Sequence, residues 1–288
     1  MIYLLLAIFG SGVIPVVFRA FQCWRINLFW TIPINYVMCV VIGNFLAVES
    51  LDIPTLASQP WTGLAALQGM LLAVNFFLLA HTAQRAGVAI AALASRLSVA
   101  IPSLLAFVLY DDTLTPVKVA GLLAALVALY LCTAPDRGSG GLTSRLFHFL
   151  PILVFATFGC YFTILKYLQT FYLNPSNYHA YVMTGFVFAL ISSILIGAGK
   201  RMFATANFRV RYLLAGISLG CINYVAVYTL LRVLALKGWE SSQLYPIYSV
   251  GVVAVSTVLA FLCFGERLSA QKTIGLAVGL IAVALLNR

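Results

Sequence analysis

Ten long apolar runs constrain the fold of this chain more than any other feature of its sequence. Each is about 20 residues long, which is the length that a helix needs to cross the hydrocarbon core of a bilayer. The runs lack the alternation of barrel strands, so they predict helices. In the first half they are Ile2–Ala20, Leu28–Val48, Trp61–His81, Val88–Leu109 and Leu114–Thr133. In the second half they are Phe149–Gln169, Asn177–Ala198, Arg211–Arg232, Ser241–Cys263 and Ser269–Leu286.

The composition leaves little room for a soluble domain beside these runs. Of the 288 residues, 63% are hydrophobic and 8% are charged, whereas a soluble domain carries about 25% charged residues. We therefore expect an all-α integral membrane protein with ten transmembrane helices joined by short connections.

A twelve-residue segment occurs twice and divides the chain into two copies of one unit. Tyr110–Gly121 reads YDDTLTPVKVAG, and Phe264–Gly275 reads FGERLSAQKTIG. The copies align aromatic, acidic, leucine, hydroxyl, lysine and glycine positions, and each lies between two apolar runs. Because five spans is an odd number, two five-helix repeats in series must lie inverted in the bilayer. We predict a first repeat over residues 1–134, a Gly- and Ser-rich linker over 135–147 and a second repeat over 148–288.

The ten short spans, the five-plus-five repeat and the segment GERLSAQKTIG resemble the drug/metabolite transporter (DMT) superfamily, in particular its EamA-like branch. Pro102, ten residues before Asp112, and the run Gly238–Gly251 fit that branch as well. The first copy departs from the motif, because Asp111 replaces the glycine and Asp112 the glutamate. The resemblance covers essentially the whole chain. It implies a transporter of small metabolites and does not identify the cargo.

The net charge of +10 is concentrated at the ends of the spans. No basic patch with interleaved aromatic residues lies outside the spans, so we expect no nucleic-acid partner. Lysine and arginine favour the cytoplasmic side of a membrane, and the larger set of basic connections therefore places both termini outside. That set comprises Arg19, Arg25, Arg85, Arg137, Arg145, Lys200, Arg201, Arg209, Arg211, Arg267 and Lys272.

Arg96 is the most informative single position, because it lies near the middle of the fourth span. A central arginine costs at least ~2.5–3.5 kcal/mol on insertion scales, so it should face water or a partner. A guanidinium can bind a carboxylate or phosphate through two hydrogen bonds. The alternative is an arginine satisfied by backbone carbonyls or a neighbouring side chain. Lys166 is a weaker candidate of the same kind, since it could extend to the membrane surface.

Polar residues in other spans complete the candidate substrate site. Asn75 and Asn223 occupy similar places in the two repeats, and a common cavity or hydrogen bonds between helices would each explain them. Tyr245 and Ser249 lie four residues apart on one face of the ninth span. No Asp or Glu lies at mid-membrane depth, so a buried proton-carrying carboxylate is not expected.

The sequence contains no HExxH or GxSxG motif and no cluster of histidine or acidic residues. The six cysteines form no CxxC pair and are interpreted as small buried hydrophobic residues. We therefore expect no catalytic residue, no metal and no cofactor, and we place a membrane-embedded enzyme behind the transporter interpretation.

The leading interpretation is a secondary transporter that exports or exchanges amino acids or other zwitterionic or anionic metabolites. A nucleotide-sugar or organic-phosphate exchanger is the alternative, followed by a non-transporting membrane scaffold. The expected partners are a small-molecule substrate and the lipid bilayer, and a homodimer is allowed. A multi-pass location in a bacterial inner (cell) membrane is expected.

Overall fold

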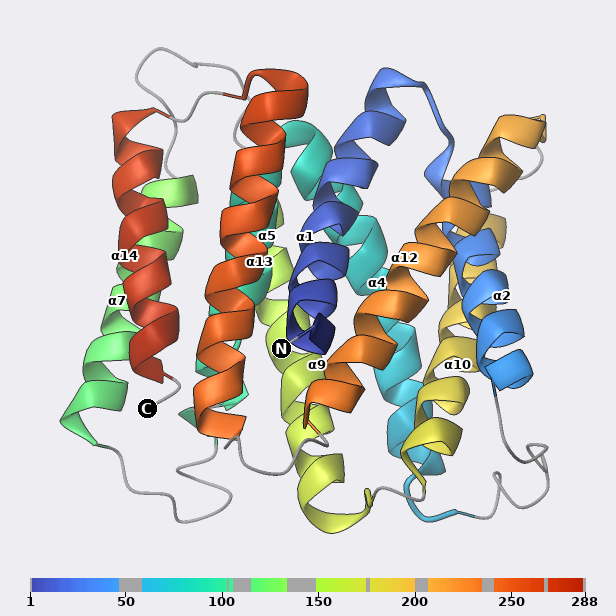
Figure 1. Cartoon of the computed structure of the whole chain (residues 1–288), viewed down its shortest axis with the longest axis horizontal. Coiled ribbons are helices and arrows are strands. Elements are labelled where there is room, and N and C mark those ends of the chain that lie inside the picture. Colours follow the sequence, from blue (N-terminus) through green and yellow to red (C-terminus); the bar gives the residue numbers. More distant parts are fainter. Residues whose placement is uncertain are drawn as a thin grey trace.

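The computed structural model describes residues 2–46, 59–102, 104–105, 115–133, 149–174, 177–199, 207–234, 241–266 and 269–286. Within these ranges the chain forms helices joined by short connections, without strands (Figure 1). The helices of the first half are α1 (Ile2–Cys23), α2 (Leu28–Leu46), α4 (Thr62–Arg85), α5 (Val88–Leu97) and α7 (Pro116–Thr133). Those of the second half are α9 (Leu150–Phe171), α10 (Tyr178–Gly199), α12 (Val210–Leu234), α13 (Ser241–Phe264) and α14 (Ala270–Leu286). The linker predicted over 135–147 lies outside the described residues.

Seven of the described helices are long and apolar enough to cross a membrane, which makes this a multi-pass membrane protein. They are α1, α2, α4, α9, α10, α12 and α13. Three shorter apolar helices cover Val88–Pro102, Pro116–Leu131 and Ala270–Leu285. Large apolar side chains on the outside of the bundle, such as Phe45 at 86% and Leu262 at 69% exposure, suit contact with lipid.

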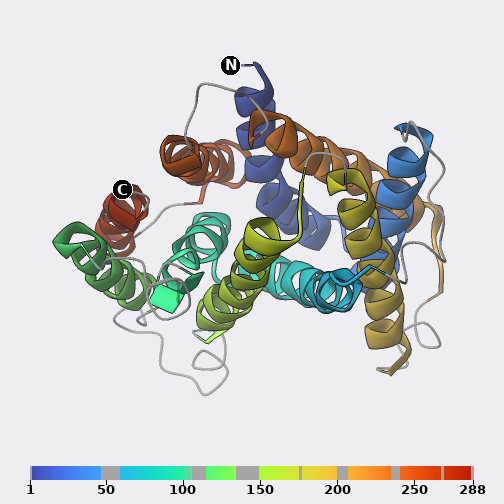
Figure 2. The ribbon, with the colours of Figure 1, turned by 90° about the horizontal axis from the view of Figure 1, so that it is seen from below.

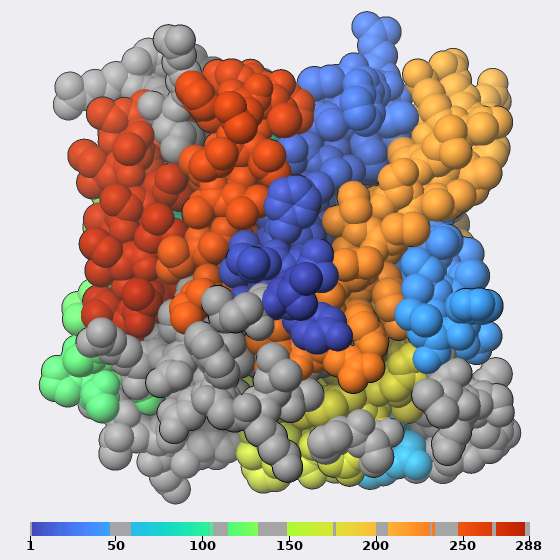
Figure 3. Space-filling model, viewed as in Figure 1, coloured from blue at the N-terminus to red at the C-terminus, as the bar shows by residue number. Residues whose placement is uncertain are grey.

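The helices pack so that each half of the chain contacts mainly the other half. α2 packs on α12, α4 on α10, and α7 on α14. α1 packs on α12 and α13, and α9 packs on α4 and α5. Figure 2 shows α7 and α14 together at one edge of the bundle. On the face shown in Figure 3, α14, α13, α1, α12 and α2 lie side by side.

Glycines allow two of these helix pairs to approach closely. A β-carbon added to Gly220 of α12 would lie 2.6 Å from Met38 Cβ and 2.8 Å from the backbone oxygen of Asn35 on α2. A β-carbon on Gly69 of α4 would lie 2.5 Å from the backbone oxygen of Gly185 on α10. Small residues at contacts between membrane helices permit this approach and the dispersion contacts that follow from it. The two cross-half contacts, α2–α12 and α4–α10, are therefore built in the same way.

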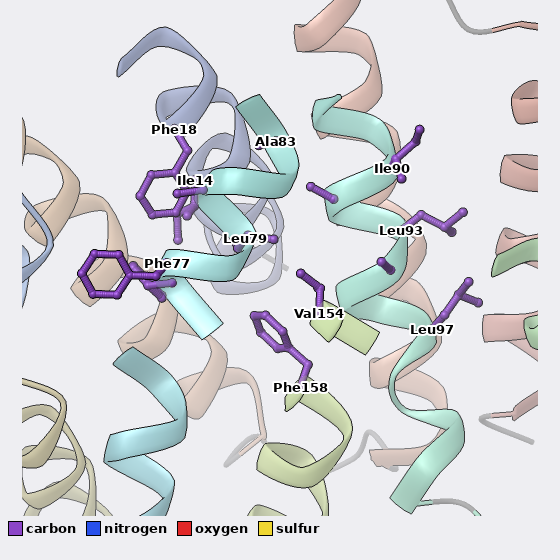
Figure 4. Close-up of a cluster of buried hydrophobic side chains, with 14 of the residues drawn as sticks. Ile14, Phe18, Phe77, Leu79, Ala83, Ile90, Leu93, Leu97, Val154 and Phe158 are labelled. Atoms are coloured by element: carbon purple, nitrogen blue, oxygen red, sulfur yellow. The ribbon is translucent and has the colours of Figure 1, made fainter. Parts of the chain in front are cut away.

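The largest core cluster draws residues from helices in both halves of the chain, and Figure 4 shows the part of it where α1, α4, α5 and α9 meet. Leu79 of α4 faces this region, whereas Leu93 and Leu97 project from the opposite side of α5. A β-carbon added to Gly279 of α14 would lie 2.6 Å from Leu93 Cδ1, so that side of α5 packs against α14. Val154 of α9 is fully buried among these helices. This core fixes α5, which carries Arg96, relative to both halves of the chain.

The fourth predicted span, Val88–Leu109, is not one continuous helix. α5 ends at Leu97, residues 98–99 form a turn, and helix resumes at residues 100–102. The amide of Ile101 donates to the carbonyl of Ser98 at 3.1 Å, which is a tighter, three-residue turn. Pro102 has no N–H, and its ring would clash with the carbonyl of Ser98 in a regular α-helix. The proline therefore explains why the helix breaks two residues after Arg96.

The described later parts of the two copies, residues 115–121 and 269–275, form the same local structure at the starts of α7 and α14. In the first copy the amide of Lys118 donates to Thr115 Oγ1 at 3.3 Å. In the second copy the amide of Lys272 donates to Ser269 Oγ at 3.5 Å. Each hydroxyl thus caps the helix that follows it. Helix capping therefore explains why both copies carry a hydroxyl residue at this position, Thr115 in the first and Ser269 in the second.

Candidate substrate-binding site

Arg96 lies in the last turn of α5, next to the break in the helix. It is eight residues after Val88, so at 1.5 Å per residue it lies about 12 Å below the start of α5. The surrounding residues of α5 are buried, whereas the arginine side chain is partly exposed. The carbonyl end of a helix carries partial negative charge, which favours a cation at this position. The local fold thus offers a charged group at depth without enclosing it completely.

The guanidinium of Arg96 rests on the ring of Tyr248 from α13. Its central carbon lies 5.0 Å from the centre of the ring, within the range of a cation–π interaction. The hydroxyl of Tyr248 is in turn 2.7 Å from Ser11 Oγ of α1. Tyr248 is 5% and Ser11 8% exposed. Three helices from both halves of the chain therefore hold the guanidinium in place.

At least one hydrogen-bond donor of Arg96 is unused by the described part of the chain. Its Nε atom is buried and has no hydrogen-bond partner there. The nearby serines do not fill this role, because Ser95 Oγ donates to the carbonyl of Ala92 at 2.8 Å and Ser98 Oγ to that of Ser95 at 2.6 Å. A guanidinium has five N–H donors arranged to fit a carboxylate or phosphate. The arrangement suits binding of an anion.

Asn75 is the second candidate whose environment suggests binding. Its side chain is fully buried in α4, and neither its amide oxygen nor its amide nitrogen has a partner within the described residues. A buried polar group left unsatisfied costs about 1–3 kcal/mol. Asn75 is ten residues before Arg85, or about 15 Å from the end of α4 at which α5 begins. The two candidates thus lie at similar depth in neighbouring helices.

Asn223 has a different environment, at the contact between α12 and α2. Its amide nitrogen donates to Asn35 Oδ1 at 3.3 Å and lies 3.6 Å from Cys39 Sγ. Cys39 Sγ lies 3.5 Å from the carbonyl oxygen of Gly220. Asn223 and Asn35 are both buried. The structure joins Asn223 to a neighbouring helix and gives it no contact with Arg96 or Asn75.

The remaining candidates are placed as follows. Lys166 is exposed on α9. Ser249 is 2% exposed and follows Tyr248 directly on α13. Tyr245 belongs to α13, but its side chain lies outside the described residues. Among the residues that the structure describes, no group of three or more His, Cys, Asp or Glu side chains could hold a metal ion.

Sequence reasoning missed Ser11 and Tyr248 as members of the site. Ser11 and Tyr248 are separated by 237 positions in the chain. One feature of the sequence does point to Tyr248 as a site residue, because it lies in the ninth span together with the candidates Tyr245 and Ser249. No such feature points to Ser11, because a serine between glycines in an apolar helix reads equally well as a helix contact.

Comparison with known proteins supports the fold and leaves the function open. No protein-family model matches the chain. An uncharacterized protein of Haemophilus influenzae is 23% identical over 285 residues, which cover 97% of this chain and 95% of that protein. A crystal structure of a protein with 17% sequence identity matches 99% of this chain and 94% of its own, with a TM-score of 0.61. The fold is therefore shared with a solved structure along nearly its whole length.

Proposed function

We propose that this protein is a secondary transporter of small anionic or zwitterionic metabolites, with amino acids as the first class to test. The observation that carries the proposal is Arg96, a cation within the bundle that is stacked on Tyr248 and has a buried, unpartnered Nε within the described residues. Charged residues inside a membrane bundle are costly and usually serve function. Transport of an anion explains why the arginine is placed there.

The proposal includes ten transmembrane helices arranged as two inverted five-helix repeats, as in EamA-like members of the DMT superfamily. α1 and α2 are joined at the top of Figure 1, whereas their counterparts α9 and α10 are joined at the bottom. The packing of α1 on α12 has its counterpart in α9 on α4, and that of α1 on α13 in α9 on α5. α7 packs on its own counterpart, α14. These relationships support an approximate two-fold axis in the membrane plane.

In this mechanism the two halves rock about a site at mid-membrane depth. Arg96 binds the acidic group of the cargo through two hydrogen bonds. Tyr248, held by Ser11, keeps the guanidinium at a fixed angle. The amide of Asn75 can both donate to and accept from a second polar group of the cargo. The site is then exposed to each side of the membrane in turn.

The proposed orientation follows from the positive-inside rule. Arg19, Arg85, Arg209 and Lys272 lie at one end of the bundle, which we call the basic end. Lys118, Lys166 and Arg232 belong to the opposite end. We assign the basic end to the cytoplasm of a bacterial cell, with both termini outside. The relative from Haemophilus influenzae supports the bacterial assignment.

The paired helices α7 and α14 lie at one edge of the bundle, where a homodimer could form.

The proposal is tested by flux through the protein in proteoliposomes. Pools of labelled amino acids, dicarboxylates and organic phosphates are offered to the wild-type protein, to Arg96→Ala and to Arg232→Ala. Arg232 is the matched control, because it is an exposed arginine near the end of α12 whose guanidinium bonds Tyr228. We expect wild type and Arg232→Ala to transport at least one anionic or zwitterionic compound and Arg96→Ala to lose most of that flux.

Three other results would redirect the assignment. Flux restricted to organic phosphates would favour the organic-phosphate or nucleotide-sugar exchanger, since a guanidinium binds phosphate as well as carboxylate. Equal flux by wild type and Arg96→Ala would exclude Arg96 as the anchor. Failure of the folded wild-type protein to move any pool would favour a scaffold.

A further inference from the structure

Glu266, the acidic residue of the second repeated segment, contacts the start of α5 from the other half of the chain. Glu266 is the second residue after the end of α13. The residue between them, Gly265, has a positive φ of 60°, which turns the chain. Its Oε2 atom accepts a hydrogen bond from the backbone N–H of Val88 at 3.1 Å. Residues 178 positions apart are thereby joined at the basic end of the bundle.

This carboxylate occupies the place of the capping side chain that α5 lacks. The residue before α5 is Gly87, and α5 has no side-chain cap of its own. A β-carbon on Gly87 would lie 2.0 Å from Glu266 Oε1, and the φ of Gly87 is 108°. The backbone conformation therefore favours glycine here, and a β-carbon at this position would displace the Glu266 carboxyl group. A helix start normally gains a hydrogen-bond acceptor from its own N-cap residue; here the other half of the chain supplies it.

α5 connects this contact to the proposed substrate site. Its residues from Val88 to Leu97 are buried except for the partly exposed Arg96. The helix is short, so its first N–H and the Cα of Arg96 are only about 12 Å apart. A shift at the start of α5 therefore moves the arginine against Tyr248, which belongs to α13, the same helix that ends before Glu266. The two contacts hold α5 against α13 at two heights.

We infer that Glu266 is a positioning residue for Arg96. Its carboxyl group, from the second half of the chain, holds the start of α5, which belongs to the first half. The inference rests on the proposed role of Arg96 as the anion anchor. Glu266 does not touch the cargo. Its contribution is to keep the guanidinium where it can bind an anion, and the hydrogen-bond acceptor, rather than the negative charge, is the essential feature.

Charged groups around Glu266 modulate this contact. Arg19 at the end of α1 and Lys272 in α14 lie near enough to lower the pKa of Glu266, as does the hydrogen bond from Val88. Burial raises the pKa more strongly, so that it lies above the ordinary value for a glutamate. Arg19 is itself engaged, since it donates to the backbone oxygen of Gln84 while Gln84 Nε2 donates to the carbonyl of Phe18 at 2.9 Å.

The test compares Glu266→Ala, Glu266→Gln and Gln271→Ala for the anion that the wild-type protein transports. Glutamine keeps an acceptor for the Val88 N–H without the charge. Gln271→Ala is the control, because Gln271 Nε2 bonds the carbonyl of Leu131 on α7 at 3.1 Å in the same region. We expect Glu266→Ala to raise KM roughly 3- to 30-fold with a smaller change in maximal rate. Glu266→Gln should restore KM to within about twofold of wild type, and Gln271→Ala should leave it unchanged.

A second measurement does not depend on the cargo. Hydrogen exchange should become faster at residues 88–91 in Glu266→Ala and not in Glu266→Gln. Unchanged exchange there, or wild-type KM in Glu266→Ala, overturns the inference. The inference is also overturned if Glu266→Ala raises KM by the same factor when Arg96 is already replaced by alanine. Glu266 would then act on KM independently of Arg96. If Arg96→Ala alone transports like wild type, the role of Arg96 as the anion anchor fails instead, whatever the result for Glu266.

Discussion

The guanidinium carbon of Arg96 and the ring centre of Tyr248 lie 5.0 Å apart, joining the end of the short helix α5 to α13 in the other half of the chain. A guanidinium held over an aromatic ring by a cation–π interaction can still donate hydrogen bonds through the N–H groups that do not point at the ring. The contact therefore orients the charge without neutralising it. In the proposed mechanism, the acidic group of the cargo neutralises the charge.

The first prediction separates the ring of Tyr248 from its hydroxyl. Tyr248→Phe keeps the stacking surface and removes the hydrogen bond with Ser11, so we expect KM for the transported anion to rise about two- to fivefold. Tyr248→Leu removes the cation–π contact as well, and KM should rise about tenfold or more. Transport kinetics of both variants in proteoliposomes check this order. If the variants Tyr248→Leu and Tyr248→Phe had equal KM values for the transported anion, the ring of Tyr248 would not orient Arg96.

The second prediction concerns Asn223, which we interpret as a contact between helices. Asn223→Ala removes its hydrogen bond to Asn35 and should lower the free energy of unfolding by roughly 0.6–2 kcal/mol. KM should stay within about twofold of wild type. Because the two asparagines are partners, Asn35→Ala combined with Asn223→Ala should cost less than the sum of the single changes. A large rise in KM with unchanged stability would instead place Asn223 at the substrate.

The third prediction tests the close approach of α12 to α2. Gly220→Val places atoms where Met38 and the backbone of Asn35 already lie, and overpacking should destabilise the protein by about 1–3 kcal/mol or more. Gly63→Ala is the control, since its β-carbon would meet nothing within 4 Å. Thermal unfolding in detergent measures both variants. Similar melting temperatures would mean that the two helices are not as tightly packed as the structure shows.

The fourth prediction follows from the raised pKa of Glu266, which burial causes. A carboxyl group whose pKa is higher in the contact with α5 than in water binds a proton more tightly in that contact. Acidification should therefore strengthen the contact as the pH falls through this raised pKa, and a rise in pH should weaken it. Hydrogen exchange at residues 88–91, corrected for intrinsic exchange rates, should be better protected at about pH 5 than at about pH 8 in the wild-type protein. Glu266→Gln should lose this pH dependence, and a pH dependence that persists in that variant would assign it to another group.

Much of the fold could be predicted from sequence because spanning helices are long and apolar. Every predicted span overlaps a described helix, from α1 at Ile2–Cys23 to α14 at Ala270–Leu286. The break after Leu97 could not be found from hydrophobicity, since the residues on both sides of it are equally apolar. Pro102 is visible in the sequence, but its effect on the helix depends on local backbone geometry.

The candidate site was only partly accessible to sequence reasoning. Arg96 could be found because a charge in an apolar span is conspicuous. Asn75 and Asn223 looked equivalent in sequence, yet Asn223 has a partner and Asn75 has none among the described residues. Contacts between helices far apart in the chain determine this difference. The same holds for Glu266, whose partner Val88 lies in the other half of the chain.

The most direct test of the account measures whether residue 96 can be reached by water from both sides of the membrane. Arg96→Cys, in a background without the native cysteines, is treated with a membrane-impermeant thiol reagent from each face of oriented proteoliposomes. Phe18→Cys serves as a core control, because Phe18 is fully buried. The account predicts labelling of position 96 from both faces and none at position 18. Position 96 protected from both faces, in a protein that remains folded, would contradict a central transport site.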